Sequence, residues 1–569
     1  MIYPRYLDGP SGTLFINLYL PTESKAPTSW ILHLPAFAEE MNKSRHVVNR
    51  MARNLVQKGH AVVVPDLYGT GESAGDFGDT NWECWQTDAQ HLIAWMNQQG
   101  GAQITLWGLR LGALLAVDVA CACPGAIRRL LLWQPVTSGR QAMTQFLRLR
   151  MAAGLMGAET ESVASLRERL NAGETLEIAG YPVSPSLYSQ VSSSAMGELL
   201  PAQSAALRID LLEVAQSEKM ALSPMARKLV ETWGNLPHSV EGQSVRGEPF
   251  WMTQELADAP DLIEKTATLF SDIDSCSQNI VVADNHDGAE IPCIFDCDGR
   301  RLVGVLHQGS PDSRRAVLVV VGGPQYRIGS HRQFLLLARS LAKAGIPVFR
   351  FDYRGMGDSE GEYRGFEDIQ DDISSAVDTL VKESPSVHEV VIWGLCDAAT
   401  AASFYAPGDP RISGLVLLNP WVRSTQGEAK ALLKHYYLQR LLSKGFWQKV
   451  FGGKFNVSEA LDSFNHNVKN AAQDKPFNHD QDESREQNLS IRLEQHLKRF
   501  TGFILFVLSE NDLTAAEFRD AVKTSKGLRK LVRQPHVQWR EIAGADHTFS
   551  RKSWRDQVVE LTRQWIKEW

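Results

Sequence analysis

The sequence predicts an α/β fold of two tandem domains, each a mostly parallel sheet that is flanked by helices and carries a helical cap insertion. Three observations favour this fold. Short apolar runs typical of buried strands alternate with longer amphipathic segments typical of helices. Two motifs occur twice at one constant separation. The length of 569 residues exceeds what one ordinary hydrophobic core supports.

An internal repeat divides the chain. The segment 65–73, Pro-Asp-Leu-Tyr-Gly-Thr-Gly-Glu-Ser, resembles 351–359, Phe-Asp-Tyr-Arg-Gly-Met-Gly-Asp-Ser, and the segment 107–112, Trp-Gly-Leu-Arg-Leu-Gly, resembles 393–398, Trp-Gly-Leu-Cys-Asp-Ala. Both pairs are separated by 286 residues, so the chain holds two copies of one unit of about 280 residues. We predict a first domain over residues 1–272, a linker rich in Asp, Ser and Asn over 273–288, and a second domain over 289–569.

The first copy alternates strands and helices in the order expected for a parallel sheet wrapped by helices. Its polar segment from about 137 to 205 is predicted to be helical and to cap the carboxyl edge of the sheet. The remaining pattern predicts strands at 12–20, 29–35, 60–65, 104–107, 130–133 and 209–215, helices near 44–58 and 84–98, a further helix ending near 122, and a closing segment over 258–270.

The second copy repeats this plan. Residues from about 425 to 498 are predicted to form a mixed cap, in which the Asn-, Asp- and Gln-rich stretch 465–488 is a loop. The remaining pattern predicts a hairpin over 291–307, strands at 316–321, 347–352, 389–393, 415–418, 503–508 and 537–542, and helices near 331–344, 366–383 and 554–569.

A sharp turn from strand to helix in the second copy places a cysteine at its apex. Cys396 follows the apolar run 389–393 and precedes a run of good helix formers, with Gly394 and Ala398 as small neighbours. Such a turn is the nucleophile elbow of α/β-hydrolases, in which bulky flanking residues would clash with the adjacent strand and helix. The start of a helix also favours a thiolate over a thiol. The pattern therefore predicts that Cys396 is a nucleophile.

A cysteine nucleophile needs a base and a third group that orients the base. In this fold the acid follows a late strand and the histidine follows the last strand. The second copy supplies Asp512 after the strand 503–508 and His547 after the strand 537–542. We predict a triad of Cys396, Asp512 and His547, with Glu510 as the alternative acid. Asp546, beside His547, is predicted to cap its loop.

Acyl transfer also requires donors for an oxyanion. The elbow offers the backbone N–H of Asp397, and the loop after the strand 316–321 offers that of Gln325, because Pro324 has no N–H. The Asp397 carboxylate would raise the thiol pKa, unless it turns away to cap the helix. Capping is the role we expect.

The first copy has lost these groups. Arg110 occupies the position of the nucleophile, only Glu218 is available as the acid, and no histidine occurs in 245–250, where the base should stand. We therefore expect a degenerate domain. Two roles remain open for Arg110: it holds a carboxylate or phosphate group of a ligand, or it forms an internal ion pair with Glu218, Glu39 or Glu40.

Composition restricts the function classes. The chain is 43% hydrophobic and 22% charged with a formal net charge of -7, and no long basic run occurs, so neither nucleic acid nor an anionic membrane is the expected partner. We find no signal peptide and no apolar stretch near the roughly 18 residues of a membrane span, and we expect a cytoplasmic protein. Seven cysteines without a Cys-x-x-Cys pair fit a reducing compartment without structural zinc, and no cofactor or metal is predicted.

Both copies resemble the serine-aminopeptidase-like α/β-hydrolases. The elbow 394–399, Gly-Leu-Cys-Asp-Ala-Ala, and the loop 322–327, Gly-Gly-Pro-Gln-Tyr-Arg, look like one of the two hydrolases that accompany bacterial exosortase A and exopolysaccharide gene clusters. The segments 35–45, Pro-Ala-Phe-Ala-Glu-Glu-Met-Asn-Lys-Ser-Arg, and 108–112, Gly-Leu-Arg-Leu-Gly, look like the other. The resemblance implies a fusion of two normally separate proteins and does not imply a substrate.

Two hypotheses follow. The first is an acyl hydrolase or acyltransferase that forms an acyl-cysteine on Cys396, with a small-molecule thioester, activated ester or lactone as substrate. Dienelactone hydrolases, which are similar in having a cysteine elbow, are a precedent for the lactone, and a saccharide acceptor is suggested only by the resemblance. The second hypothesis is a non-catalytic binding or assembly protein whose two halves pack as a pseudo-dimer. The oligomeric state is left open.

Overall fold

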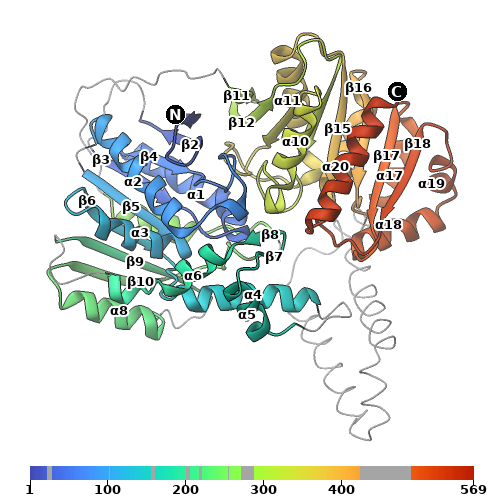
Figure 1. Ribbon diagram of the computed structural model, residues 1–569. Coiled ribbons are helices and arrows are strands. Elements are labelled where there is room, and N and C mark those ends of the chain that lie inside the picture. Colours follow the sequence, from blue (N-terminus) through green and yellow to red (C-terminus); the bar gives the residue numbers. More distant parts are fainter. Residues whose placement is uncertain are drawn as a thin grey trace, which may run out of the picture. The chain divides into compact units, whose positions relative to one another are not determined.

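The computed structural model describes residues 1–21, 29–101, 103–154, 161–199, 206–216, 221–253, 255–270, 288–422 and 489–569. In this part of the chain two eight-stranded sheets carry helices on their faces, as the sequence predicts (Figure 1). The order of strands is β1-β2-β4-β3-β5-β6-β9-β10 in the first sheet and β11-β12-β14-β13-β15-β16-β17-β18 in the second. The repeat in sequence is therefore also a repeat in topology.

The first sheet is antiparallel at one edge and parallel elsewhere. β1 pairs antiparallel with β2, and β2 pairs antiparallel with β4, whereas the remaining pairs are parallel. β4 is buried at every position, because helices cover both faces of a parallel sheet. The strands are β1 (Ile2–Leu7), β2 (Leu14–Tyr19), β3 (Ser29–Leu34), β4 (Ala61–Pro65), β5 (Gln103–Leu109), β6 (Ile127–Trp133), β9 (Arg208–Ala215) and β10 (Ser239–Arg246).

The second sheet follows the same plan. β11 and β12 form the predicted antiparallel hairpin, and β12 also pairs antiparallel with β14. The pairs β13–β14, β16–β17 and β17–β18 are parallel. The strands are β11 (Glu290–Cys297), β12 (Arg300–His307), β13 (Arg315–Val320), β14 (Val348–Asp352), β15 (Glu389–Leu395), β16 (Ile412–Leu418), β17 (Phe503–Ser509) and β18 (Val537–Ile542).

The helices bury one apolar face. In α1 the residues Val47, Met51 and Leu55, spaced three or four apart, pack into the core of the first sheet. The helices before residue 271 are α1 (Glu39–Gln57), α2 (Trp82–Gln98), α3 (Leu111–Ala122), α4 (Gly139–Gly154), α5 (Val163–Asn171), α6 (Pro185–Ser193), α7 (Met196–Leu199), α8 (Pro224–Gly234) and α9 (Pro260–Thr268). Those after residue 287 are α10 (Gln333–Lys343), α11 (Gln370–Glu383), α12 (Asp397–Tyr405), α17 (Leu489–Arg499), α18 (Leu513–Thr524), α19 (Lys526–Leu531) and α20 (Lys552–Lys567).

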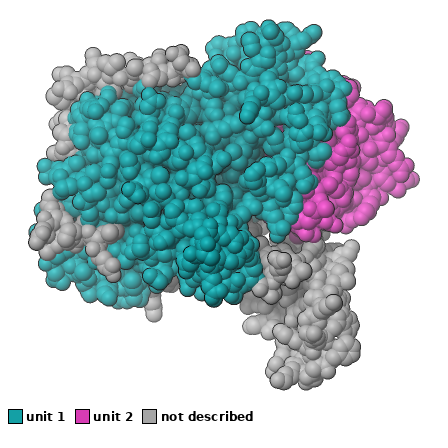
Figure 2. Space-filling view, in the orientation of Figure 1, with its two compact units in different colours: residues 1–392, 549–569 teal, residues 393–548 magenta. Residues whose placement is uncertain are grey.

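The chain divides into two compact units. The first comprises Met1–Ile392 with Phe549–Trp569, and the second comprises Trp393–Thr548 (Figure 2). The division falls within β15, so the first unit contains the whole first sheet together with β11 to β14. The predicted linker 273–288 lies outside the described residues except for its last position, and the predicted domain boundaries stay predictions.

The first copy differs from the sequence prediction in its cap and at the edges of its sheet. The cap expected to be helical over 137–205 also contains an antiparallel hairpin, β7 (Leu176–Ile178) and β8 (Tyr181–Val183), whose turn at Ala179 and Gly180 has positive φ at both residues. Both edge strands of the sheet escaped prediction: Pro4 interrupts the short pattern of β1, and the exposed position of β10 leaves it polar. The second predicted cap lies outside the described residues, apart from its last part in α17.

Candidate active site

Cys396 lies at the turn that joins β15 to α12. Its backbone has φ 62° and ψ -123°, a conformation that a residue other than glycine adopts only when its surroundings impose it. The Cys396 N–H donates to the Leu418 carbonyl (2.9 Å), and the Cys396 carbonyl accepts from the Trp421 N–H (3.2 Å). Gly394 has no room for a side chain, because an added Cβ would lie 2.8 Å from the carbonyl carbon of Ala398. The small flanking residues therefore permit the close packing of strand and helix.

Three of the predicted site residues lie together in the second unit. The Nδ1 of His547 is 3.0 Å from the Oδ1 of Asp512. The His547 side chain also forms a hydrogen bond with the Cys396 side chain. The Asp512 side chain is only 7% exposed, whereas 38% of the His547 side chain is exposed. The thiol, the imidazole and the carboxylate therefore lie in one line of contacts, and the imidazole of His547 is open to solvent.

The position of Asp512 is fixed by the helix that follows it. Its Oδ2 accepts the backbone N–H of Ala515 (2.9 Å), so the side chain caps the start of α18. Burial alone would raise the pKa of Asp512, but the hydrogen bonds from His547 and from the Ala515 N–H hold this pKa below its usual value. The carboxylate therefore stays charged where it contacts the imidazole.

The protonation of the thiol and the imidazole is coupled. Burial lowers the pKa of His547, but hydrogen bonds to Asp512 and Cys396 outweigh burial and hold this pKa well above its usual value. Burial raises the pKa of Cys396, and the hydrogen bond from His547 offsets part of that increase. A protonated imidazole beside the sulfur is the arrangement that stabilises a thiolate.

Asp397 acts on the sulfur in two opposite ways. Its backbone N–H forms a hydrogen bond with the sulfur of Cys396 and lowers the thiol pKa, whereas its carboxylate raises that pKa. The Oδ1 of Asp397 accepts the N–H of Ala398 (2.9 Å), so the carboxylate also caps the start of α12, the role expected from the sequence.

The neighbouring acids have other partners. The Oε2 of Glu510 accepts the N–H of Gly544 (2.7 Å), and it is Asp512 whose carboxylate contacts His547. The backbone carbonyl of Asp546 accepts the hydroxyl of Ser509 (2.7 Å), which ties the loop before His547 to the end of β17.

Two residues near the site were missed by sequence reasoning. Asn419 donates from Nδ2 to the backbone carbonyl of His547 (3.0 Å) and accepts at Oδ1 from the N–H of Ser509 (2.9 Å). Both Asn419 and Ser509 are fully buried. Each is a polar residue at the carboxyl end of an apolar strand, and that was the available signal, because these ends line the ligand edge of an α/β sheet.

Gln325 belongs to the first unit, in the loop after β13. Its backbone N–H donates to the carbonyl of Gly323 (2.9 Å), and its Nε2 donates to the carbonyl of Gly322 (2.6 Å). These bonds hold the loop in a tight turn. The role of Gln325 as an oxyanion donor stays a prediction.

The first copy keeps the elbow but not the chemistry. Arg110 has φ 57° and ψ -118° between β5 and α3, nearly the conformation of Cys396. Its guanidinium lies 3.1 Å from the Glu40 Oε1 and 5.3 Å from the centre of the Trp251 ring. Burial raises the pKa of Glu40, and Arg110 opposes that rise. Of the ion pairs that the sequence left open, the structure contains the one with Glu40, whereas Glu218 lies outside the described residues.

Neither a metal cluster nor a membrane helix is present in the described ranges. Nowhere in them do three or more His, Cys, Asp or Glu side chains gather as metal ligands would. No helix in the same ranges combines the length and the apolar character needed to cross a bilayer.

Known proteins place the chain among hydrolases. A family model described as Serine aminopeptidase, S33, matches residues 27–193 and 312–505, more than half of the chain. No curated protein matches the sequence.

Several solved structures are similar at low identity. The Pyrococcus furiosus esterase Pf2001 is 15% identical, with 49% of this chain and 92% of that chain covered and a TM-score of 0.34. Est1E from Butyrivibrio proteoclasticus is 14% identical, with 47% and 95% covered and a TM-score of 0.34. XC6422 from Xanthomonas campestris, an α/β serine hydrolase without a lid, is 15% identical, with 48% and 94% covered and a TM-score of 0.29.

Proposed function

The chain belongs to the serine aminopeptidase S33 family of α/β hydrolases, and from this membership we propose that its C-terminal half is an acyl hydrolase or acyltransferase with Cys396 as nucleophile. The observation that carries the proposal is the line of contacts from Cys396 through His547 to Asp512, with 3.0 Å between the imidazole and the carboxylate. The family is named for a serine, so a cysteine at the nucleophile position is a departure, and we expect it to change the range of substrates. A thiolate suits thioesters, activated esters and lactones.

The mechanism assigns one task to each group. His547 takes the proton of the Cys396 thiol, and the thiolate attacks the acyl carbon. The backbone N–H of Asp397 holds the oxyanion that forms. The sequence predicts the N–H of Gln325, which donates to the Gly323 carbonyl in this structure, as the second donor. His547 then donates its proton to the leaving group, which departs and leaves an acyl-cysteine. Asp512 orients the imidazole and stabilises its charged form.

The second step releases the acyl group. His547 acts as base toward the incoming acceptor, whose oxygen attacks the acyl carbon and displaces the Cys396 sulfur. Water as acceptor makes the protein a hydrolase, and a hydroxyl group makes it a transferase. A saccharide hydroxyl in an exopolysaccharide or exosortase system is the variant that the sequence resemblance suggests.

A trapped acyl-enzyme tests the proposal. The purified chain is mixed with a p-nitrophenyl acyl ester, quenched in acid and examined by peptide mass spectrometry. We expect release of p-nitrophenol and an acyl group on the peptide that contains Cys396. Cys396→Ala should abolish both signals, while Cys84→Ala, which removes a half-buried thiol from α2, should preserve them. Turnover that survives Cys396→Ala would refute the mechanism.

A non-catalytic binding role is the second candidate, and one feature of the first copy favours it. The elbow of the first copy carries Arg110 in place of a nucleophile, and the Arg110 guanidinium lies 3.1 Å from Glu40. A hydrolase fold without a nucleophile can bind a ligand or a partner without transforming it. An absence of both p-nitrophenol release and labelling of Cys396 in the same experiment would favour this candidate.

A further inference from the structure

Contacts between the two halves of the chain within the first unit are reciprocal. The Arg53 guanidinium on α1 donates to the backbone carbonyl of Asp358 (3.0 Å), and the Arg339 guanidinium on α10 donates to the backbone carbonyl of Glu72 (3.0 Å). Arg53 and Arg339 are 286 residues apart, and so are Glu72 and Asp358. The same pair of positions therefore meets twice, once in each direction.

The loops that accept these contacts have the same internal structure. The Oδ2 of Asp66 accepts the N–H of Glu72 (2.9 Å), and the Oδ2 of Asp352 accepts the N–H of Asp358 (3.0 Å). These pairs are again related by 286 residues. Arg332 adds contacts in one direction only, because its guanidinium donates to the backbone carbonyls at positions 69, 71, 73 and 75.

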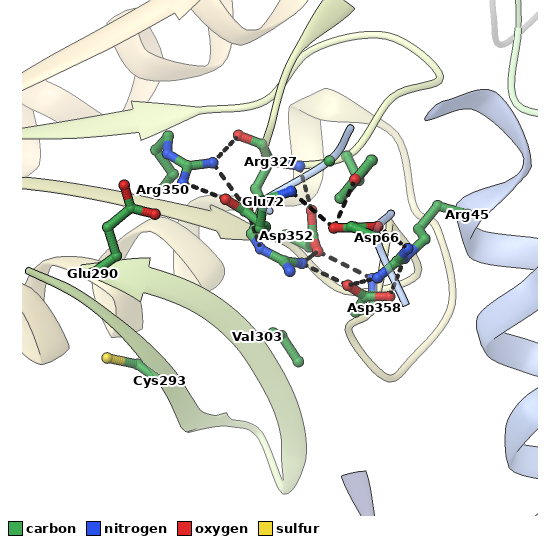
Figure 3. Close-up of polar contacts among 12 residues, drawn as sticks. Arg45, Asp66, Glu72, Glu290, Cys293, Val303, Arg327, Arg350, Asp352 and Asp358 are labelled. Carbon is green, nitrogen blue, oxygen red and sulfur yellow. Dashed lines mark hydrogen bonds and ion pairs between the residues drawn. The ribbon is translucent and has the colours of Figure 1, made fainter. Parts of the chain in front are cut away.

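Buried charges join the two loops at the centre of this contact. The Arg350 Nη2 lies 2.7 Å from Glu72, and the Arg45 Nε lies 2.6 Å from Asp358. Arg327 lies 2.9 Å from Glu72 and 2.7 Å from Asp358, and thus connects both acids (Figure 3). All five side chains are at most 3% exposed. Each acid therefore has a cation from the other half as partner, and removal of one half would leave the other with uncompensated charges at its surface.

Apolar side chains extend the contact. Met41 of the first half packs in one buried cluster with Tyr326, Ile328 and Leu335 of the second. Val303 of the second half belongs to the buried core that the first half builds around α1. The contact therefore combines a buried apolar part with the charged centre, as in permanent interfaces.

We propose that the chain is a covalently linked dimer whose two halves dock through one self-complementary surface. Each half presents its Gly-rich loop, 66–73 or 352–359, to the arginine-bearing helix of the other half, α10 or α1. Reciprocal contact of equivalent residues is the mark of a two-fold, isologous interface. The partner that fits this surface is another copy of the same α/β unit, and the covalent link between the copies is not needed for docking.

Cleavage of the intact chain tests the proposal. A site for a sequence-specific protease is inserted at position 280, and the folded protein is cut to completion, as judged on a denaturing gel. We expect the two fragments to sediment as one species of the uncut mass. Arg53→Ala and Arg339→Ala should each weaken the association by about tenfold or more, because each removes a charged donor from the interface.

Arg563→Ala is the matched control. Arg563 forms an ion pair with Glu560 one turn away on the same helix, α20, so its removal should not change the association of the fragments. Separation of the wild-type fragments at low salt would overturn the proposal. Equal behaviour of Arg53→Ala, Arg339→Ala and the control would overturn it as well.

A separate observation indicates what the first half does for the second. His331 and Arg332, at the end of the loop that follows β13, have φ values of 42° and 62°, which side chains other than glycine rarely adopt. Such strain persists only where the surroundings impose it. The first half supplies part of these surroundings, because the Glu39 carboxylate accepts the His331 N–H (3.3 Å).

Asn42 binds the same loop at two points. Its Oδ1 accepts the N–H of Tyr326 (3.0 Å), and its Nδ2 donates to the carbonyl of Gly329 (3.1 Å). Ser330 adds a third, since its hydroxyl lies 3.1 Å from the Glu39 Oε1. We infer that Glu39 and Asn42 are positioning residues for the loop 322–332. This inference rests on the proposed function, because the loop carries the proposed oxyanion donor Gln325.

Hydrogen exchange and kinetics test this inference together. In Asn42→Ala we expect faster exchange over the loop 322–332 and a lower kcat toward a p-nitrophenyl ester, with the rate of alkylation of Cys396 unchanged. Lys43→Ala, the next residue on α1, is the control and should change none of these.

The outcomes separate this inference from the proposed function. Unchanged exchange in Asn42→Ala would overturn the positioning role. Faster exchange with an unchanged kcat would overturn the link between the loop and catalysis. If the wild-type chain hydrolyses no ester, the proposed function fails, and the exchange measurement still decides whether Asn42 holds the loop.

Discussion

Asp512 contacts two partners with its two carboxylate oxygens: Oδ1 lies 3.0 Å from the Nδ1 of His547, and Oδ2 accepts the N–H of Ala515 at the start of α18. The helix therefore holds the acid, and the acid holds the imidazole. The two roles of Asp512, as the cap of α18 and as the charged partner of His547, can therefore be tested separately. Asparagine caps a helix about as well as aspartate but carries no charge.

Asp512→Asn should therefore lower kcat without destabilising the fold. We expect a loss of about 10²- to 10⁴-fold, since the uncharged amide no longer stabilises the protonated imidazole. Its NH₂ group would also donate to Nδ1 and so favour the wrong tautomer of His547. Steady-state kinetics with an acyl ester and thermal unfolding measure the two effects. Glu510→Gln is the matched control, because the Glu510 carboxylate accepts the Gly544 N–H (2.7 Å) while Asp512 contacts His547, so this substitution should leave kcat nearly unchanged. A larger loss in Glu510→Gln would reassign the acid.

The pH dependence of alkylation should shift in opposite directions in two variants. The hydrogen bond from His547 lowers the pKa of Cys396, so His547→Gln should move the midpoint of its reaction with iodoacetamide to higher pH. The carboxylate of Asp397 raises the same pKa, so Asp397→Asn should move the midpoint to lower pH while its backbone N–H remains.

Peptide mass spectrometry assigns the modification in this experiment, because other free cysteines are present. Cys293, buried in β11, has a pKa raised to about 12 by burial and serves as an internal reference that both substitutions should leave unchanged. A shift of the same sign in both variants would show that the carboxylate and the imidazole do not act on the sulfur as the contacts indicate.

The sequence predicted the two sheets because their evidence is local. The alternating apolar runs are visible from neighbouring residues. The identical separation of Asp66 from Arg110 and of Asp352 from Cys396 can be counted directly along the chain. The sequence also named His547 and Asp512, since the order of elements in this fold fixes where each must follow a strand.

The contacts between the halves were beyond sequence reasoning for a physical reason. A buried arginine such as Arg327 has the same local pattern as an exposed one, and only the tertiary structure brings it to Glu72 and Asp358. Asn419 was missed for the same reason, because its partners lie 90 or more residues away along the chain.

Arg110 offers a test of the ion pair in the degenerate site. Glu40→Gln should leave the guanidinium of Arg110 without its carboxylate partner, so added inorganic phosphate should raise the melting temperature of this variant more than that of the wild type. Arg110→Ala should lower stability by about 1 kcal/mol or less, because both side chains are partly exposed. Equal stabilisation of the wild type by phosphate would show that Arg110 is an anion site despite Glu40.

Acid should weaken the contact between the halves through Glu72. Burial raises the pKa of Glu72, but Arg350 and Arg327 outweigh it and lower the pKa to about 2 from a usual value of 4.5. Because the pKa is lower in the folded state, the carboxylate stabilises the fold fully above pH 4.5 and loses this effect as the pH falls toward 2. Glu72→Gln should therefore destabilise the chain by about 3 kcal/mol at neutral pH.

The difference in the free energy of unfolding between Glu72→Gln and the wild type should shrink as the pH is lowered, because the wild-type carboxyl then becomes protonated and loses its charge. Urea unfolding of both proteins at a series of pH values from neutral to about 2.5 measures the difference across the range in which the wild-type carboxyl becomes protonated. Glu231→Gln is the control, since this glutamate is exposed on α8 and its loss should leave stability unchanged at every pH. A deficit that stays constant or grows in acid would show that the charge of Glu72 is not what joins it to Arg327 and Arg350.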